Sequence, residues 1–317
     1  MRLKLYSVIV VFIVICSVMN GQVTETEKKL RTVNADTIMG WKTAGLFSVN
    51  LAQTSLTNWA AGGQNSLAIN GLFTFLANYK QGKSSWDNSL DLGYGFLKQG
   101  KDADLMKTDD KIDFMSKYGR EAFKNFNYAA LLNFKTQMSP GYKYPDTENK
   151  ISDFFAPAYL LLAVGLDYKP SGYFSTFLAP LTAKFTFVND QSLSDAGAFG
   201  VTPGEKSRTE FGGYLRVVYT RGDFKNEFLK NIALITKLDL FSNYTENPQN
   251  IDVSWETLIN LKVNKFISVN FNTHLLYDDN IKVPVDRNGN GIYESTEAPG
   301  VRTQFKEILG VGFSYKF

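Results

Sequence analysis

The chain has 317 residues, of which 21% are charged and 14% aromatic, and its formal net charge is only +3. A charge balance this close to neutral argues against a nucleic-acid-binding surface. The length allows one or two domains. The only cysteine, Cys16, lies in an N-terminal segment that we expect to be removed, so the mature chain should have neither disulfides nor thiol catalysis.

The first 21 residues are typical of a secretory signal peptide. Arg2 and Lys4 precede an apolar run that continues to Met19, and the small residue Gly21 offers a cleavage point. The alternative is a retained membrane anchor, but a helix that crosses a bilayer needs about 20 apolar residues. We therefore expect residues 22–40 to be a polar periplasmic tail and residues 41–317 to be the folded domain.

From Gly45 onward, apolar and polar residues alternate with a period of two, and no stretch keeps a helical period. An even number of strands fits a closed, antiparallel, transmembrane β-barrel of about twelve strands, an all-β fold. The alternative is a secreted soluble β-sandwich, in which the apolar faces of two sheets pack on each other. The predicted strands lie near residues 45–56, 65–81, 85–98, 111–123, 127–139, 157–169, 173–188, 209–223, 231–245, 251–264, 267–278 and 303–317.

The connections between these strands alternate between short and long. Residues 81–84, 123–126 and 264–266 fit tight turns, whereas the segments 189–208 and 278–302 are long loops. Outer-membrane barrels have short turns on the periplasmic rim and long loops on the outer rim. The alternation therefore predicts that the long loops face away from the cell.

The last predicted strand separates its two faces most clearly. One face is apolar and should contact lipid, and the other is small or polar and should face the lumen. The apolar face carries Phe305, Leu309, Val311, Phe313, Tyr315 and Phe317; the opposite face carries Gln304, Lys306, Gly310, Gly312, Ser314 and Lys316.

Aromatic residues gather at the predicted turn side, where rings of this kind settle at headgroup depth in a membrane. They are Tyr79, Trp86, Phe123, Tyr128, Tyr168, Tyr173, Tyr315 and Phe317. The final strand ending at Phe317 also resembles the signal that the bacterial barrel-assembly machinery reads. We therefore expect two partners, outer-membrane lipid and that machinery, and a location in the bacterial outer membrane.

The charged residues of the predicted lumen faces balance in sign. Unpaired charges in a narrow interior are costly, so the balance indicates cross-strand ion pairs. Two interpretations remain open: these side chains only fill the barrel, or some of them line a narrow solute path. The set comprises Asp87, Asp91, Asp113, Asp167, Asp239, Asp252, Glu256, Lys117, Lys135, Lys184, Arg216, Lys237, Lys262 and Lys306.

His274 is the only histidine and is predicted to face the lumen. A barrel lipase would need a serine, a histidine and an orienting polar group facing lipid, and no serine motif accompanies His274. We therefore predict that the protein is not an enzyme. One histidine and no mature cysteine also argue against a transition-metal centre.

The loop before the last strand fits the D-x-[DN]-x-[DN]-G-x5-E pattern of a calcium-binding loop over residues 286–297. Gly291 would supply the sharp turn. No helices flank the loop, and the N-G-N-G run is also typical of an ordinary turn. The predicted ligands are Asp286, Asn288, Asn290, the backbone carbonyl of Ile292, Glu294 through a water molecule, and Glu297. Calcium is the only cofactor for which the sequence offers a candidate site.

Residues 57–64 read TNWAAGGQ and follow the first predicted strand. Trp59 is there expected to anchor the rim or cover the mouth of the barrel, with ligand stacking as the less favoured alternative. Residues 40–72, which include this segment, together with residues 303–317 resemble an uncharacterised outer-membrane β-barrel family of Bacteroidetes, a domain of unknown function, and the similarity extends from about Gly40 to Phe317. The N-W-x-x-G-G element that carries the resemblance is Asn58, Trp59, Gly62 and Gly63. The resemblance implies a barrel in the outer membrane and brings no activity.

The sequence thus favours an outer-membrane barrel that acts as a narrow passive channel or transport accessory for small solutes. The alternative is a barrel that does not conduct and that presents its long loops to a partner.

Overall fold

The computed structural model describes residues 39–57, 60–61, 63–101, 103–264, 267–283, 285 and 299–316, and these form a closed antiparallel barrel of twelve strands. The prediction of an all-β barrel is therefore confirmed. Around the ring the order is β1-β16-β13-β12-β11-β10-β9-β8-β5-β4-β3-β2. The barrel strands are β1 (Gly40–Thr54), β2 (Ser66–Gln81), β3 (Ser84–Gln99), β4 (Met106–Phe123), β5 (Phe126–Thr136), β8 (Ala158–Tyr168), β9 (Phe174–Phe187), β10 (Ser207–Arg221), β11 (Ile232–Asn243), β12 (Ile251–Lys262), β13 (Ile267–Tyr277) and β16 (Gln304–Lys316).

Each of the twelve predicted strands has its counterpart, and the largest differences are two early starts. β1 begins at Gly40 instead of residue 45, because its first residues pair with the end of β2, with Trp41 opposite Tyr79. β4 begins at Met106 instead of residue 111, because Met106 and Lys107 still pair with β3. The sequence of both extensions is polar enough to look like a loop, and pairing with a long neighbour makes them strands.

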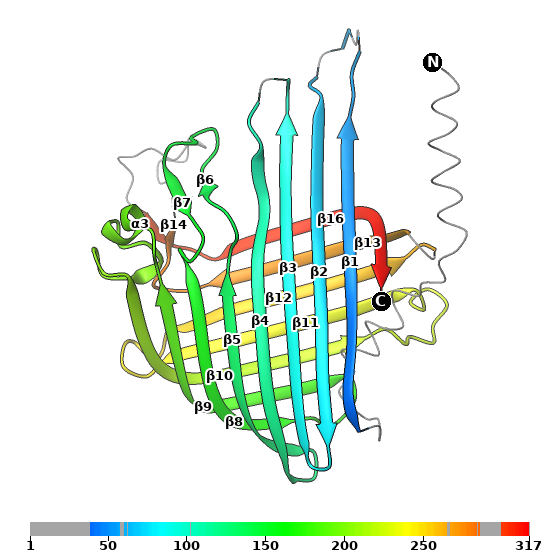
Figure 1. Ribbon diagram of the computed structural model, residues 1–317, viewed down its shortest axis with the longest axis vertical. Coiled ribbons are helices and arrows are strands. Elements are labelled where there is room, and N and C mark those ends of the chain that lie inside the picture. Colours follow the sequence, from blue (N-terminus) through cyan, green and yellow to red (C-terminus); the bar gives the residue numbers. More distant parts are fainter. Residues whose placement is uncertain are drawn as a thin grey trace.

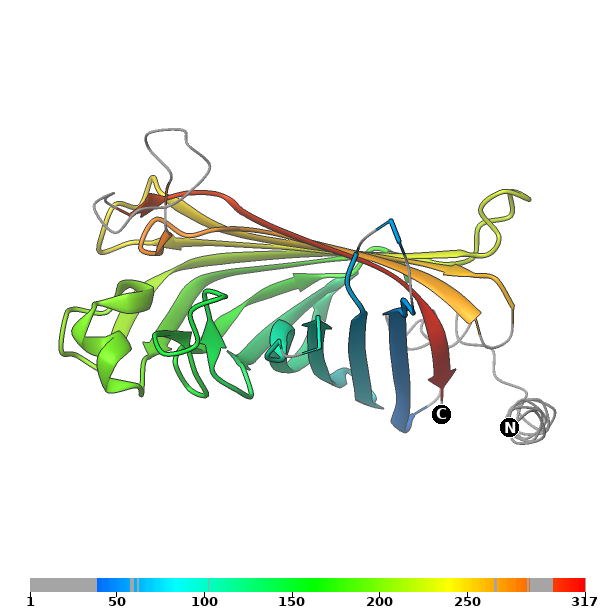
Figure 2. The same cartoon turned by 90° about the horizontal axis from the view of Figure 1, so that it is seen from above.

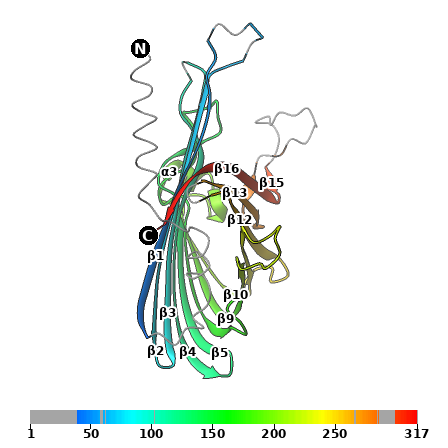
Figure 3. The ribbon, with the colours of Figure 1, turned by 90° about the vertical axis from the view of Figure 1, so that its right-hand side faces the viewer.

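The barrel is flattened into two walls. Figure 1 shows β1 to β5 standing nearly upright, while β11, β12, β13 and β16 cross behind them at a steep angle. Seen from above, the two walls form two layers, and β16 curves from the rear wall to meet β1 (Figure 2). The side view shows the same narrow profile (Figure 3). Side chains from opposite walls can therefore meet inside.

The connections follow the predicted alternation, with long loops at one end of the barrel and short turns at the other. The loop side also carries the small elements, and we call the two ends the loop side and the turn side. No helix in the described part of the chain is both long and apolar enough to cross a membrane. The small elements are β6 (Gly141–Tyr142), β7 (Lys150–Ser152), α3 (Gln191–Asp195), η1 (Ala198–Gly200), β14 (Lys282–Val283) and β15 (Gly300–Val301).

The outer surface of the barrel carries large apolar side chains, as the alternation predicts. Leu181 is 73% exposed, Leu309 69% and Phe305 62%. A soluble protein rarely leaves contiguous apolar patches of more than a few hundred Å² uncovered. The exposed rows therefore need an apolar environment around the barrel.

A bulge in β9 reverses which residues point inward along that strand. Pro180 has no N–H group to donate to a neighbouring strand, and the pairing with β8 and with β10 shifts beside it. Phe177 is buried before the bulge, and Thr182 is buried after it. At the same place Gly165 of β8 lies so close to β9 that a Cβ atom would come within 2.0 Å of the Leu178 carbonyl oxygen. Glycine is required there by this close approach.

The lumen also contains an apolar cluster. It joins neighbouring strands β5, β8, β9, β10 and β11, with Phe177 and Tyr214 in edge contact at a centroid distance of 6.3 Å. Apolar side chains therefore also face the lumen at this place, where neighbouring strands bury them against one another. The buried members are Ala129, Leu131, Ala163, Phe177, Ala179, Tyr214 and Phe241.

Candidate functional site

The middle of the lumen is crossed by an ion pair between opposite walls. Lys111 Nζ lies 2.7 Å from Glu256 Oε1. Lys111 belongs to β4 and Glu256 to β12, and these strands are six positions apart in the ring of twelve, which is the largest separation possible. The two side chains therefore join the walls directly across the interior.

A second ion pair crosses beside the first. Lys237 of β11 lies 3.5 Å from Asp91 of β3, again six positions apart in the ring. Asp113 lies 3.7 Å from Lys111, and Lys237 lies 3.8 Å from Glu256, so the charges alternate in sign. We call Asp91, Lys111, Asp113, Lys237 and Glu256 the charge belt. Beside it remains a cavity of about 70 Å³, the space of roughly two water molecules at ~30 Å³ each.

A larger cavity of about 320 Å³, the loop-side cavity, lies between the charge belt and the long loops. Lys184 lines it and contacts Asp252 at 2.6 Å and Asp278 at 3.2 Å. Asp252, Asp278 and Asp279 each place an oxygen within 4.8 Å of the others. Lys184 thus supplies a positive charge to Asp252 and Asp278, while Asp279 accepts a hydrogen bond from Asn250.

The loop-side cavity also holds a contact between Ser254 and His274. Ser254 Oγ lies 2.9 Å from His274 Nε2, and both side chains line the cavity. The sequence interpretation placed His274 in the lumen but linked no serine to it. The register of the β12–β13 hairpin could have identified this serine. Glu256 is opposite His274, so Ser254, two residues before Glu256, is the diagonal neighbour of His274.

A third cavity, of about 270 Å³, lies at the turn side and is polar. Lys169 lines it and bridges Asp87 at 3.0 Å and Asp167 at 3.2 Å. Asp167 in turn accepts two bonds of 3.0 Å from Lys117 Nζ, and its side chain is only 1% exposed. The charge belt therefore separates two cavities, one toward each end of the barrel.

Most of the predicted lumen charges take part in such pairs. Arg216 donates to Asp239 at 2.9 Å, and Lys135 approaches Asp113 at 3.8 Å. Lys306 contacts Asp109, a residue that the sequence interpretation did not include, at 2.8 Å. Lys262 is partly exposed at the turn-side end of β12. Three further charged lumen residues were not predicted. Lys111 pairs with Glu256, Lys169 with Asp87, and Glu210 with Lys184.

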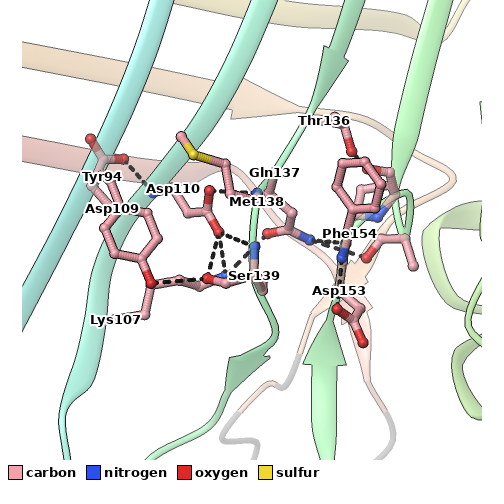
Figure 4. A network of polar contacts seen from close by, with 12 residues as sticks. Tyr94, Lys107, Asp109, Asp110, Thr136, Gln137, Met138, Ser139, Asp153 and Phe154 are labelled. Carbon is pink, nitrogen blue, oxygen red and sulfur yellow. Dashed lines mark hydrogen bonds and ion pairs between the residues drawn. The ribbon is translucent and has the colours of Figure 1, made fainter. Parts of the chain in front are cut away.

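A polar network fixes the loop after β5 against β4, as Figure 4 shows. The Asp110 carboxylate accepts from the backbone N–H groups of Met138 at 2.7 Å and Ser139 at 2.9 Å. Lys107 Nζ donates to Asp110 at 3.0 Å and to the Ser139 carbonyl at 2.8 Å. Tyr94 from β3 reaches the Ser139 hydroxyl at 3.2 Å. The loop rim is therefore held by directed hydrogen bonds.

A second contact joins two long loops. Lys150 of β7 contacts Asp153 at 2.7 Å and Asp190, the N-cap of α3, at 2.5 Å. These hydrogen bonds raise the pKa of Lys150. The hydrogen bond from Lys150, and then that from Ser192, lowers the pKa of Asp190. The raised pKa of Lys150 and the lowered pKa of Asp190 both widen the pH range over which the two side chains are charged.

Aromatic rings gather at the turn side as predicted. Trp41 lies 5.2 Å from Tyr79 and 5.6 Å from Trp86, measured between ring centroids. Phe126 lies 4.6 Å from Phe123 and 4.5 Å from Tyr168. Trp41 and Phe126 were not part of the predicted belt.

Several predicted sites lie outside the described residues. These are the calcium-binding loop from Asp286 to Glu297, the C-terminal Phe317 and, within the N-W-x-x-G-G element, Asn58, Trp59 and Gly62. Gly63 is described and has a φ of 115°, a left-handed value that favours glycine.

Residues 51–142 match the profile of a family described as a protein of unknown function (DUF3078). The match runs from the end of β1 into the loop after β5 and includes the N-W-x-x-G-G element. It agrees with the predicted resemblance to a domain of unknown function and brings no activity. No curated protein matches the sequence significantly.

Among solved structures, similar folds include an outer membrane channel from Pseudomonas putida F1, with 10% identity, a TM-score of 0.39, and coverage of 89% of this chain and 97% of that one. The translocator domain of the autotransporter NalP from Neisseria meningitidis has 9% identity, a TM-score of 0.34, and coverage of 92% and 95%. Outer membrane phospholipase A from Escherichia coli has 10% identity, a TM-score of 0.36, and coverage of 93% and 98%. These proteins differ in function, and likeness at this level assigns none of their activities to the chain.

Proposed function

We propose that the protein is a narrow outer-membrane channel for small solutes whose lumen is closed at its middle by the charge belt. The observation that carries the proposal is the pair Lys111–Glu256, which joins opposite walls of the lumen at 2.7 Å. A solute moving between the two cavities would have to pass the belt. Conduction therefore requires the belt to part.

Ion pairs can act as such a barrier because their energy depends on their surroundings. Two charges removed from water attract each other strongly but lose hydration, so the net energy of the pair is far smaller than either contribution. Water that enters between the walls restores the hydration and lowers the cost of separation. The belt can thus hold the lumen closed when it is dry, and its ion pairs can separate when water enters.

Recording in planar bilayers tests the proposal. The wild-type barrel should show rare conductance steps or none, whereas Lys111→Ala combined with Glu256→Ala should show more frequent steps, because the double change removes the shorter of the two ion pairs that cross the lumen and leaves Lys237 with Asp91. A matched control is Lys150→Ala with Asp190→Ala, which removes an ion pair between loops and should behave like wild type. Persistent wide conductance of the wild type would refute the closed lumen.

The alternative is a barrel that does not conduct and presents its loops to a partner. The hydrogen bonds that Asp110 accepts from the loop after β5 favour it, because they fix that loop in one shape. If the folded double variant Lys111→Ala/Glu256→Ala remains silent in bilayers, the channel proposal fails and this alternative stands.

The proposed location in the outer membrane rests on the apolar rows of the outer surface and on the aromatic rings at the turn side. Barrel-assembly machinery and lipid are the partners that this location implies. Separation of membranes by density, followed by detection of the protein, tests the location. Recovery of the mature chain in a soluble fraction without detergent would contradict it.

Calcium binding by the loop from Asp286 to Glu297 is a separate proposal, supported by its sequence pattern alone. Calcium would stiffen the loop and would not take part in catalysis. Titration calorimetry on the refolded protein tests this, and absence of calcium heat at millimolar concentration would contradict it.

A further inference from the structure

We propose that Ser254 and His274 form a nucleophile and general base, and that the loop-side cavity is an acyl-transfer site for small esters. This activity is independent of conduction through the lumen. The decisive observation is the distance of 2.9 Å between Ser254 Oγ and His274 Nε2, within the range in which a histidine can take the proton of a serine.

The backbone holds the two residues in this arrangement. β12 and β13 are paired from Val253–Tyr277 to Lys262–Ser268, with Glu256 opposite His274. Residues on one face of an antiparallel pair at diagonal positions lie within reach of long side chains. The contact is therefore built on two paired strands and does not depend on a loop, which gives a site better positional precision.

The hydrogen bond has the direction needed for catalysis in one tautomer of the histidine. With the proton on Nδ1, Nε2 is an acceptor, and the Ser254 hydroxyl donates to it. In that tautomer the imidazole can remove the serine proton as Oγ attacks. The opposite tautomer would donate to Oγ and would not activate it.

The surroundings provide space and two kinds of contact for a substrate. The cavity of about 320 Å³ corresponds to roughly eleven water molecules at ~30 Å³ each, enough for a small ester. Leu161 and Phe241 line it and can contact an acyl chain. Lys135 also lines it, and its ammonium group is a suitable partner for the negative oxygen of a tetrahedral intermediate.

The reaction conserves atoms and charge with water as the only co-reactant. Ser254 Oγ attacks the ester carbonyl carbon while His274 takes the hydroxyl proton. The bond from the carbonyl carbon to the ester oxygen breaks, and His274 returns the proton to the departing alcohol. Water then attacks the acyl-serine in the same way, which releases the acid and restores the serine.

Labelling with a small alkyl fluorophosphonate tests the proposal on the intact refolded barrel. Ser254 Oγ attacks phosphorus, fluoride leaves, and mass spectrometry locates the phosphonate on the peptide that contains Ser254. Ser254→Ala should abolish labelling of that peptide. His274→Gln should slow labelling by about 100-fold or more, since general-base assistance contributes ~10²–10⁴-fold.

Ser268→Ala is the matched control. Ser268 is buried on β13 in the same barrel, and the amide of Asn270 lies near its hydroxyl at 3.4 Å. Its substitution should leave labelling of Ser254 unchanged, and the folding of each variant is checked by its heat-dependent gel mobility. Turnover of p-nitrophenyl acetate should fall in parallel with labelling.

Two outcomes would overturn the proposal. Absence of phosphonate on Ser254 in a folded wild-type sample would show that the hydroxyl is not activated. Equal labelling of Ser254 in wild type and His274→Gln would show an accessible serine with no base. Neither result bears on bilayer conductance, so the channel proposal stands or falls separately.

Discussion

Replacing Asp167 by asparagine should destabilise the barrel strongly, because it leaves a buried cation without its partner. The Asp167 carboxylate accepts bonds of 3.0 Å from Lys117 Nζ and lies 3.2 Å from Lys169 Nζ. The side chain of Lys117 is 11% exposed and that of Asp167 1%. Asparagine has nearly the same volume, so the change removes charge without creating a cavity.

The magnitude follows from Coulomb's law and the cost of desolvation. Two unit charges 3.0 Å apart at an effective dielectric constant of about 20 attract by about 5 to 6 kcal/mol. Loss of hydration offsets part of this attraction, and removing one partner of a buried pair costs ~3–5 kcal/mol. We therefore expect the free energy of unfolding to fall by about 3 to 5 kcal/mol in Asp167→Asn.

The double variant Lys117→Met/Asp167→Asn separates the lost pair from the stranded charge. It removes both members, and Lys169 keeps Asp87 at 3.0 Å. The double variant should therefore be more stable than Asp167→Asn alone, by about 1.5 kcal/mol or more, since neutralising both members of a buried pair is often tolerated.

Urea unfolding of the barrel in lipid vesicles, followed by tryptophan fluorescence, measures these differences. Lys230→Met is the exposed control. Its partner is Glu227, the two side chains are 51% and 87% exposed, and a change below about 1 kcal/mol is expected. The electrostatic account would be refuted if Asp167→Asn unfolded like wild type, or if the double variant were less stable than Asp167→Asn.

Three further changes have defined outcomes. Gly165→Ala should lower the free energy of unfolding by about 1 to 3 kcal/mol, because the new methyl group meets a β9 carbonyl. Gly71→Ala, whose new methyl group would have its nearest atom at 3.7 Å, should lower it much less. Equal effects of the two changes in urea unfolding would contradict this. Trp86 fluorescence should be quenched by lipids brominated near the headgroup more than by lipids brominated at the chain end, and the reverse order would refute a headgroup position. Asp190→Ala should speed hydrogen exchange of residues 191–195 several-fold at pH 7. The lowered pKa of Asp190 means that its contribution is present above the ordinary carboxyl pKa and lost as the pH falls through the folded value, so exchange of wild type and variant should converge only in strong acid.

The strands could be predicted because their alternation depends on neighbours in sequence alone. Each residue of a strand faces opposite to the next, so a lipid-facing surface imposes a period of two. The partners inside the lumen could not be predicted in the same way. Glu256 meets Lys111, 145 positions away, only because the ring order sets β4 opposite β12 and the barrel is flat.

Two features were not predicted, although the sequence contains information about them. The Ser254–His274 contact follows from the register of one hairpin, and it was overlooked because the interpretation required a serine motif at the lipid surface. The reversal along β9 follows from Pro180, which lacks the N–H group that a regular ladder needs. Simple alternation assigns Phe177 and Thr182 to opposite faces, yet both are buried.

The charge belt requires the flattened shape of the barrel. A circular barrel of twelve strands spaced about 4.8 Å apart and tilted about 40° would have a backbone diameter of roughly 24 Å. A lysine and a glutamate reach only about 5 to 6 Å each with bonds of ~1.5 Å, and with their contact of 2.7 Å they span about 14 Å. Lys111 and Glu256 can therefore meet only when the walls approach each other. Removing the pair removes one restraint on the rounder form, and a rounder barrel has a wider lumen, which is the change that the proposed channel would use to conduct.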